Sequence, residues 1–207
     1  MTHPERPRRN FYGRLKGKTL KSSQKSYIDE DLQALSPGAV SWEANPERSL
    51  LDLNTLFGGR PVWLEIGFGG GEHMAARADM LPDHGFIGAE PFVNGVAQAL
   101  THVDGDNGAH PPLGNVRIHH GDALEVLRRI PDGSLSFLYL LHPDPWPKAK
   151  HHRRRLFQEP FLDAVVRVLK PGGEFLFKTD HEEYFEWSEE HLGKFQNLER
   201  LPWAEDD

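Results

Sequence analysis

The sequence contains no cysteine, and this absence excludes disulfides, zinc–thiolate sites and a cysteine nucleophile. It also has no run of about 18 apolar residues, so we expect no membrane-spanning helix. Residues 1–18 lack the apolar stretch of a signal peptide. We therefore expect a cytoplasmic protein without a membrane partner.

The chain has 207 residues, of which 38% are hydrophobic and 10% are aromatic. This length and composition predict one domain with a full core, and they exclude a chain that is disordered throughout. The formal net charge is −7. Taken alone, a negative total argues against a nucleic-acid partner.

The charge is spread unevenly along the chain. Residues 1–25 carry eight Lys and Arg and one acid, whereas residues 181–207 carry nine acids and two bases. The basic segment shows no apolar period, so we predict a mobile arm over residues 1–30 in front of a domain over residues 31–207. Such an arm is either a solubilising tail or a phosphate-binding segment that orders on RNA or DNA.

The body of the sequence alternates between strand and helix patterns. Strands are predicted at 62–66, 86–90, 115–119, 134–141 and 174–178, and helices at 72–80, 93–100, 122–130, 157–168 and from about 181. This order predicts an α/β fold with a doubly wound, mostly parallel sheet and helices on both faces. Ligands of such sheets bind beyond the carboxyl ends of the strands.

A glycine-rich loop follows the first predicted strand, and it includes Gly67 and Gly69. A dinucleotide fingerprint requires a third glycine where this chain has Glu72, which disfavours a nicotinamide-dependent oxidoreductase. The pattern E-x-G-x-G-x-G looks like the S-adenosylmethionine loop of class I methyltransferases. The alternative is a tight turn that binds nothing. Glu65 ends a buried strand, and its carboxylate requires a partner such as a cationic amine or a sulfonium.

Two further acids follow the next strands. Glu90 ends the second strand, where a carboxylate can accept hydrogen bonds from the ribose hydroxyls of a nucleoside or can simply cap the next helix. Asp122 lies three residues before Glu125, the spacing of a capping box, and its backbone could also contact adenine. Neither acid distinguishes NAD from S-adenosylmethionine.

The fourth strand ends in a proline-rich motif around Asp144. Prolines at 143, 145 and 147 restrict the backbone and predict a rigid loop. Five Lys and Arg and two His follow within residues 148–155. A rigid acid beside cations suits an enzyme that acts on RNA, although the cations could merely begin a helix. Trp146 either stacks on a base or anchors the loop. We expect no metal site, because the two histidines have no further ligand at a suitable spacing.

Together these motifs resemble the bacterial tRNA (guanine-N7-)-methyltransferase family over nearly the whole chain. The matching segments are Glu65–Gly69, Gly88–Glu90, Asp122–Ala123, Pro143–Lys148 with His151–Arg155, Thr179–Asp180 and the basic segment Gly13–Lys18. The proline motif followed by His-His-Arg-Arg-Arg is the most specific of them, since the glycine loop occurs in many methyltransferases.

The resemblance implies methyl transfer from S-adenosylmethionine to N7 of a guanine in the variable loop of tRNA. The implied cofactor-site residues are Glu65, Gly67, Gly69, Glu90, Asp122 and Asp144. Asp144 is also the candidate catalytic residue. The candidate substrate contacts are Lys148 and Asp180, with Arg153 and Arg154 of the basic cluster. A non-catalytic RNA-binding module and a class I methyltransferase for another substrate remain as alternatives.

This sequence departs from the family in two places. His142 stands where the family usually has Phe or Leu. No Thr-x-x-Glu tetrapeptide, which the family uses near its last strands, follows Asp180. Class I methyltransferase sheets end in an antiparallel strand pair, of which residues 195–201 could supply at most one strand. We therefore expect an incomplete C-terminal strand pair.

Overall fold

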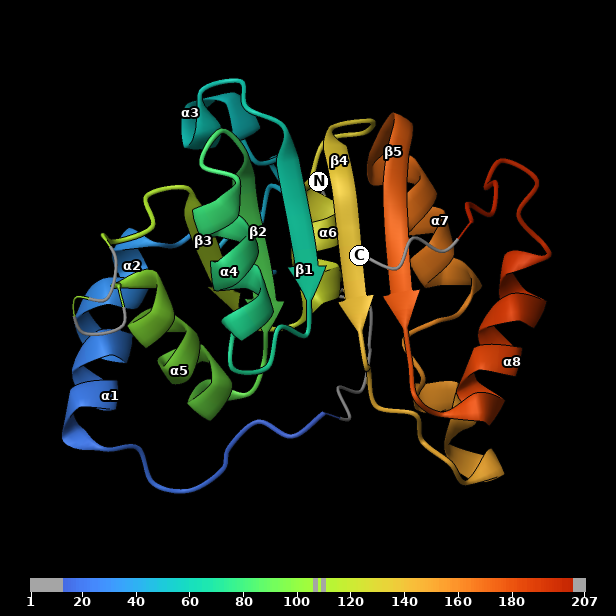
Figure 1. Ribbon diagram of the computed structural model, residues 1–207, viewed down its shortest axis with the longest axis horizontal. Helices are drawn as coiled ribbons and strands as arrows, with labels where there is room; N and C mark the ends of the chain where they lie inside the picture. The colour runs from blue at the N-terminus through green and yellow to red at the C-terminus, as the bar shows by residue number, and fades with distance from the viewer. Residues whose placement is uncertain (1–12, 106–107, 109–110, 203–207) are drawn as a thin grey trace.

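The computed structural model describes residues 13–105, 108 and 111–202, and its centre is one parallel sheet of five strands (Figure 1). The strands are β1 (Val62–Ile66), β2 (Gly85–Glu90), β3 (Val116–His120), β4 (Leu135–Leu141) and β5 (Leu169–Lys178). Their order across the sheet is β3-β2-β1-β4-β5. The chain thus winds outward from β1 to β3 and then returns to the other side of β1, so the switch point lies between β1 and β4.

Two helices cover one face of the sheet at β1, β2 and β3. They are α4 (Glu72–Met80) and α5 (Val93–Val103). Their apolar side chains, including Met74 and Leu100, form one core cluster with Phe86 of β2 and Ile118 of β3. Gly88 allows α4 to lie this close, because a Cβ there would overlap the side chains of Met74 and Phe68.

The opposite face is covered by α6 (Ala123–Arg129) and α7 (Glu159–Val168), and α8 (Glu182–Leu192) packs at the β5 side of the molecule. Leu64 and Ile66 of β1 point to this face, together with Leu138 of β4. Tyr184 brings α8 into the same core cluster. The doubly wound prediction with helices on both faces is confirmed.

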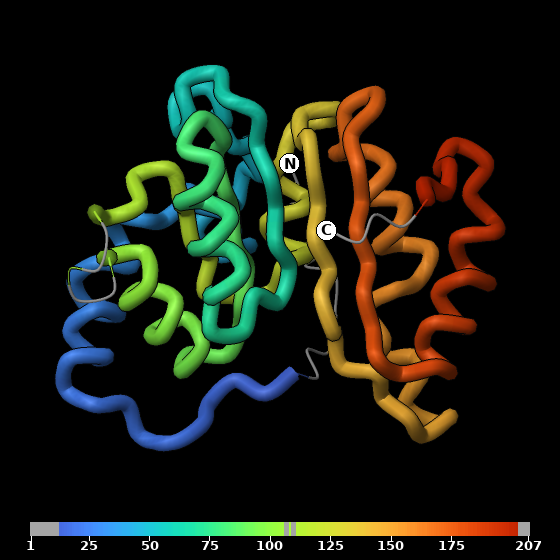
Figure 2. The backbone as a smooth tube through the Cα atoms, in the orientation of Figure 1, coloured from blue at the N-terminus to red at the C-terminus, as the bar shows by residue number. Residues whose placement is uncertain are grey.

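The N-terminal part of the chain runs along the carboxyl-end edge of the sheet and then up beside α5 (Figure 2). Its helical segments are α1 (Ser22–Ser26), the π-helical turn η1 (Tyr27–Asp31) and α2 (Leu32–Ala34), and α3 (Leu53–Phe57) precedes β1. The predicted arm boundary at residue 30 falls within η1, and arm residues 1–12 lie outside the described part of the chain.

The predicted elements agree with the structure except at the last strand. β5 begins at Leu169, five residues before the predicted start at 174. Leu169 pairs with Leu135, and the register then shifts so that Glu174 pairs with Phe137. The intervening Pro-Gly-Gly segment, with Gly172 at φ 74°, therefore forms a bulge within the strand. A Pro-Gly-Gly sequence is typical of a turn between elements, so the strand was predicted to begin only after it.

In the described residues after α8, turns occupy 193–194 and 196–197, and no strand forms as far as residue 202. Segment 195–201 therefore contributes no strand to the described sheet. None of the described helices is long and apolar enough to cross a membrane.

Candidate functional site

A cavity of about 380 Å³ opens at the carboxyl ends of β1, β2 and β4, next to the switch point of the sheet. Its position is the one expected for a ligand in a doubly wound fold. The lining residues that carry predicted roles are Gly67, Glu90, Asp122, Asp144 and Arg154. The structure thus brings together acids from three strand ends and one cation of the basic loop.

Glu90 connects the end of β2 to the glycine loop. The backbone N–H of Gly69 donates to its Oε2 at 3.0 Å, and that of Phe92 donates to its Oε1 at 2.8 Å. Burial raises the pKa of the Glu90 carboxyl, these two hydrogen bonds lower it in part, and the negative charge of Asp144 adds to the rise. The carboxylate is therefore fixed in orientation before any ligand binds.

The glycine loop depends on backbone conformations that other residues rarely adopt. Gly67, Gly69 and Gly71 have φ values of 70°, 57° and 82°. Gly67 lines the cavity, whereas Gly69 is absent from its lining and bonds Glu90 instead. Gly95 of α5 allows this helix to pack directly against the loop, because a Cβ at this position would overlap the carbonyl oxygen of Gly69.

Asp122 caps the next helix, as its position in the sequence predicts. It is the N-cap of α6, and its carboxylate accepts a hydrogen bond from the Leu124 amide at 3.0 Å. It also lines the cavity beside Ala123. The capping interaction holds the start of α6 at the cavity wall.

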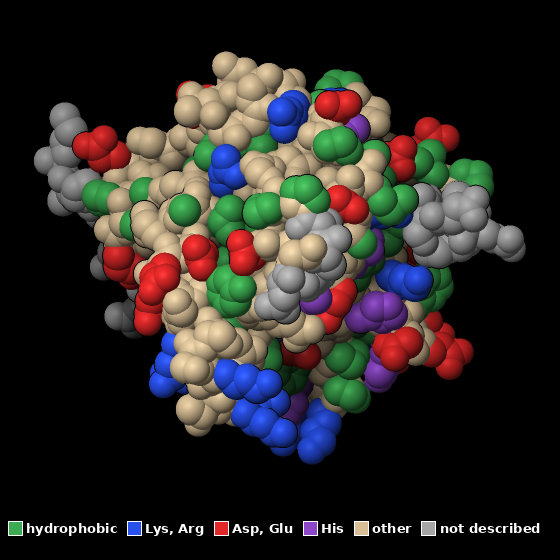
Figure 3. Space-filling model, turned by 60° about the vertical axis from the view of Figure 1, so that its left-hand side comes forward, with side chains coloured by type: hydrophobic (Ala, Val, Ile, Leu, Met, Phe, Trp, Pro, Cys, Tyr) green, Lys and Arg blue, Asp and Glu red, His purple; other side chains and the backbone are tan. Residues whose placement is uncertain are grey.

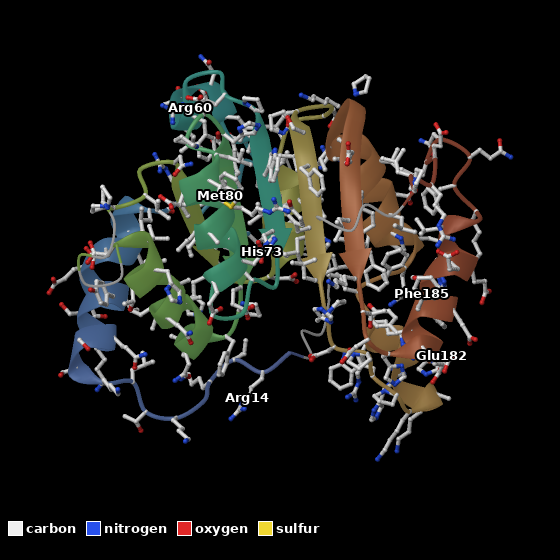
Figure 4. All side chains as sticks on the ribbon, viewed as in Figure 1. Arg14, Arg60, His73, Met80, Glu182 and Phe185 are labelled. Atoms are coloured by element: carbon white, nitrogen blue, oxygen red, sulfur yellow. The ribbon has the colours of Figure 1, made fainter. Side chains whose placement is uncertain are left out.

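Glu65 lies outside the cavity lining. Residues of β1 alternate between faces, so Glu65 shares the α4 face with Trp63, while Ile66 turns toward the cavity. Oε2 of Glu65 lies 2.7 Å from Nδ1 of His73 on α4, so the buried carboxylate has a partner within the protein. Figure 4 shows His73 beside the end of β1. The spacing of the sequence motif gave no sign of this pairing.

The proline-rich loop places Asp144 at the cavity rim between two strained residues. His142 and Trp146 both have left-handed backbone conformations, with φ values of 46° and 45°. Both line the cavity with Asp144. Nδ1 of His142 lies 3.8 Å from Oδ1 of Asp180 at the end of β5. His142, which stands where the family usually has Phe or Leu, therefore lines the cavity close to Asp180.

The basic cluster divides into exposed and buried parts. Lys148 and Arg153 are exposed, and Arg153 lies in the short 3-10 helix η2 (Ala149–Arg154). Arg154 lines the cavity, and its guanidinium lies 4.9 Å from the centre of the Trp146 ring. Arg155 is buried. Lys and Arg side chains gather at the end of the molecule toward which the strands point (Figure 3).

The N-terminal segment supplies a wall of the cavity that sequence reasoning missed. Gly13 and Arg14 line it, and the Arg14 guanidinium lies 5.4 Å from the centre of the Phe92 ring. Figure 4 shows Arg14 below the strand ends. Asn94 holds the segment, since it accepts from the Gly17 amide at 2.8 Å and donates to the Lys18 carbonyl at 2.7 Å. A contact across more than 70 residues leaves no local pattern in the sequence.

Within the described residues, no group of three or more His, Cys, Asp or Glu side chains is arranged to hold a metal ion.

Solved methyltransferase structures share the fold of this chain. The 16S rRNA methyltransferase KamB matches with a TM-score of 0.51 at 18% identity, over 70% of this chain and 74% of that one. A structure described as an antibiotic related methyltransferase matches with a TM-score of 0.50 at 19% identity, over 69% and 71%. The parallel sheet and the cavity at its switch point define a class I methyltransferase fold.

Sequence comparisons define the family more narrowly. Residues 59–207 match the family model described as "Putative methyltransferase". The tRNA (guanine-N(7)-)-methyltransferase of Novosphingobium aromaticivorans is 64% identical over 84% of this chain and 70% of its own length. That of Ruegeria pomeroyi is 49% identical over 99% of this chain and 87% of its own length. The chain belongs to the tRNA (guanine-N7-)-methyltransferase family.

Proposed function

We propose that this protein transfers a methyl group from S-adenosylmethionine to N7 of a guanine in the variable loop of tRNA. The observation that carries the proposal is the convergence of Glu90, Asp122 and Asp144 on one cavity beside a glycine loop. Family membership supports the reaction and the tRNA substrate, since the relatives carry this activity in their names. A methyltransferase of the same fold that acted on another substrate would not need a basic loop next to the cavity.

The donor set of the cavity fits the cofactor. Glu90 is buried and lines the cavity, and its carboxylate can accept further hydrogen bonds from ribose hydroxyls. Gly67 leaves room for close approach of a ligand to the backbone, and Asp122 with Ala123 forms a further wall. When bound, S-adenosylmethionine supplies an electrophilic methyl group on a sulfonium. Through its contact with His73, Glu65 stabilises the start of α4 directly after the glycine loop. This role is in addition to its predicted role in the cofactor site.

The reaction requires orientation and charge stabilisation more than acid–base chemistry. Guanine N7 has a free lone pair and no proton, so its methylation needs no general base. The base gains positive charge as the new bond forms, and a carboxylate beside the ring therefore stabilises the transition state more than the neutral substrate. Asp144 at the rim of the cavity is suited to this role. Asp180, close to His142, is suited to hold the amino edge of the guanine.

RNA contacts are assigned to the exposed cations. N7 lies in the deep major groove of an A-form helix, which side chains do not enter, so the target base must be unstacked or in a loop. Arg154 lines the cavity, and together with the exposed Lys148 and Arg153 of the same segment it can bind neighbouring phosphates. The Trp146 ring lines the cavity and offers a surface on which the base can stack.

The test is incubation of the protein with an unmodified tRNA transcript and isotopically labelled S-adenosylmethionine, followed by digestion to nucleosides and mass spectrometry against standards. We expect labelled N7-methylguanosine, and we expect none with a transcript whose variable-loop guanines are replaced by adenine. Methylation of another position would contradict the proposed target. Calorimetry without RNA separates the alternatives, because a non-catalytic RNA-binding module would bind tRNA and not the cofactor.

A further inference from the structure

Arg155 is the one cation of the basic cluster whose side chain is fully enclosed, with 0% of it exposed. An enclosed guanidinium is costly unless its donors and its charge are satisfied. A residue that served only to attract phosphates would gain nothing from this burial. The contacts of Arg155 are therefore those of a residue in the protein interior.

Its first contact is to the loop that carries Asp144. Nε of Arg155 donates to the carbonyl oxygen of Pro145 at 2.8 Å. This carbonyl belongs to the Pro145–Trp146 peptide, so the bond fixes the loop one residue after the candidate catalytic carboxylate of Asp144. Pro145 has no backbone N–H, so this carbonyl is the one backbone hydrogen-bonding group that the residue offers.

Its other side-chain contacts are to α8, and Nη1 has no hydrogen-bond partner among the described residues. Nη2 lies 3.3 Å from Oε1 of Glu183, and the guanidinium lies 5.0 Å from the ring centres of both Tyr184 and Trp187. Nε2 of His152 lies 3.0 Å from the same Glu183 oxygen. Arg155 thus joins the Asp144 loop to the first turns of a helix that begins just after Asp180.

The chain immediately after Arg155 is bound to the same helix. Nε1 of Trp187 donates to the carbonyl of Phe157 at 2.8 Å, and the Phe157 amide donates to the hydroxyl of Tyr184 at 3.3 Å. Burial raises the pKa of Tyr184 to about 12, so its hydroxyl stays protonated. The α8 end of the connection is therefore rigid, and Arg155 transmits this rigidity to Pro145.

We propose that Arg155 is a positioning residue of the methyl-transfer reaction, and that it fixes the Asp144 loop against α8 and hence against Asp180. The role rests on the proposed function, because it concerns the two acids assigned there to the guanine. Arg155 itself touches neither substrate nor cofactor. Its effect is to hold two carboxylates from different strand ends at a constant separation, which a reaction that depends on orientation requires.

The test compares Arg155→Met, which keeps the length of the apolar stem but removes the donors, with the matched control Arg128→Met on the exposed side of α6. Arg155→Lys is the conservative variant, since it keeps one charged donor. We expect kcat to fall by about tenfold to a hundredfold in Arg155→Met with little change in the KM for tRNA, and partial recovery in Arg155→Lys. The control should keep the parent kcat. A parent-like kcat in a folded Arg155→Met would overturn the proposal, and so would an equal loss in the control.

A second measurement does not depend on activity. Amide hydrogen exchange followed by mass spectrometry should show faster exchange in a peptide spanning residues 142–156 of Arg155→Met, with the sheet unchanged. Unchanged exchange there would overturn the positioning role even if the parent chain proved inactive on tRNA, whereas an inactive parent would reject the proposed function. If Arg155→Met does not fold, Glu183→Ala replaces it, because Glu183 is half exposed and its removal takes the ion-pair partner on α8 away from the same guanidinium.

Discussion

The backbone N–H of Gly69 donates to the carboxylate of Glu90 at 3.0 Å, although the two residues lie 21 positions apart in the sequence. The bond joins the glycine loop after β1 to the end of β2. The glycine loop and the end of β2, which a nucleoside cofactor would contact, are therefore fixed to each other in advance. This lowers the entropy lost when a ligand binds.

Replacing Glu90 by Gln tests this arrangement. We expect the Kd for S-adenosylmethionine to rise by about tenfold to a hundredfold, since hydrogen bonds to a charged group contribute about 1.5–3 kcal/mol. Because burial raises the pKa of Glu90, affinity of the parent should also be lost on acidification at a higher pH than an ordinary glutamate would cause. Calorimetry measures the Kd of the variant and its pH dependence in the parent. The control Glu174→Gln, at an exposed position of β5, should leave the Kd unchanged. An unchanged Kd in Glu90→Gln would remove this residue from the cofactor site.

Gly95→Ala should damage the same loop from the opposite side. The added methyl would overlap the carbonyl oxygen of Gly69, a backbone atom that cannot move without shifting the loop. We expect cofactor affinity to fall at least tenfold and the melting temperature to drop, as overpacking costs about 1–3 kcal/mol. Gly114→Ala is the control, because a Cβ there meets nothing within 4 Å. Equal cofactor affinity in the two variants would show that the loop tolerates displacement.

Asp144→Ala should remove most methyl transfer while leaving the fold intact. The side chain is exposed at the cavity rim, so its loss opens no core cavity, and circular dichroism and the melting temperature should match the parent. Turnover should fall by about a hundredfold, which is typical for removal of one charge-stabilising group. Asp144→Asn should be similarly slow if the negative charge matters more than the shape. Near-parental turnover in both variants would reject the role given to this carboxylate.

Asn94→Ala should loosen the N-terminal segment from the cavity. It removes both hydrogen bonds that join Asn94 to Gly17 and Lys18, and with them the support for the cavity wall at Arg14. We expect weaker cofactor binding, by about three- to tenfold, and faster trypsin cleavage after Lys16 and Lys18, with the melting temperature nearly unchanged. Asn54→Ala, in the short helix α3 away from the cavity, is the control. Unaltered cleavage would show that other contacts hold the segment.

His119 should make the protein less stable in mild acid. Burial, with a smaller effect from the charge of His120, lowers the pKa of His119 from 6.5 to about 4, while Asp122 partly opposes this and Glu125 lies 3.5 Å away. Between these two pH values the unfolded chain binds a proton that the folded chain excludes, so stability falls as the pH falls. The unfolding free energy should drop by about 2 kcal/mol between pH 7 and pH 5 from this group alone. Urea unfolding of His119→Asn should show a shallower decline, and an equal decline would assign the effect elsewhere.

Local patterns in the sequence were sufficient to name several residues that the fold brings to the cavity. The ends of β1, β2 and β4 carry Gly67, Glu90 and Asp144, and the topology of a doubly wound sheet brings such ends together without knowledge of any distance. The helix from 72 to 80 was predicted with the observed limits, because its start follows a glycine turn and its end precedes a proline.

Long-range contacts account for what the sequence did not reveal. The Glu65–His73 pair depends on which face of β1 lies under α4, and the Arg14 wall depends on a contact with α5 far along the chain. Arg155 looks identical to its neighbours in a basic run, yet packing against α8 buries it. Composition reports the charge of such a residue but not its surroundings, so only the folded chain separates the cations that can face RNA from the one that cannot.

The left-handed backbone at His142 and Trp146 has a consequence for how this protein can change over time. Each such residue costs on the order of 1–3 kcal/mol relative to a relaxed loop. Glycine at either position would relieve that strain but would delete a ring from the cavity wall. The rest of the fold must therefore maintain a reserve of stability, and selection for a more stable protein and selection for a working site act in opposite directions on this loop.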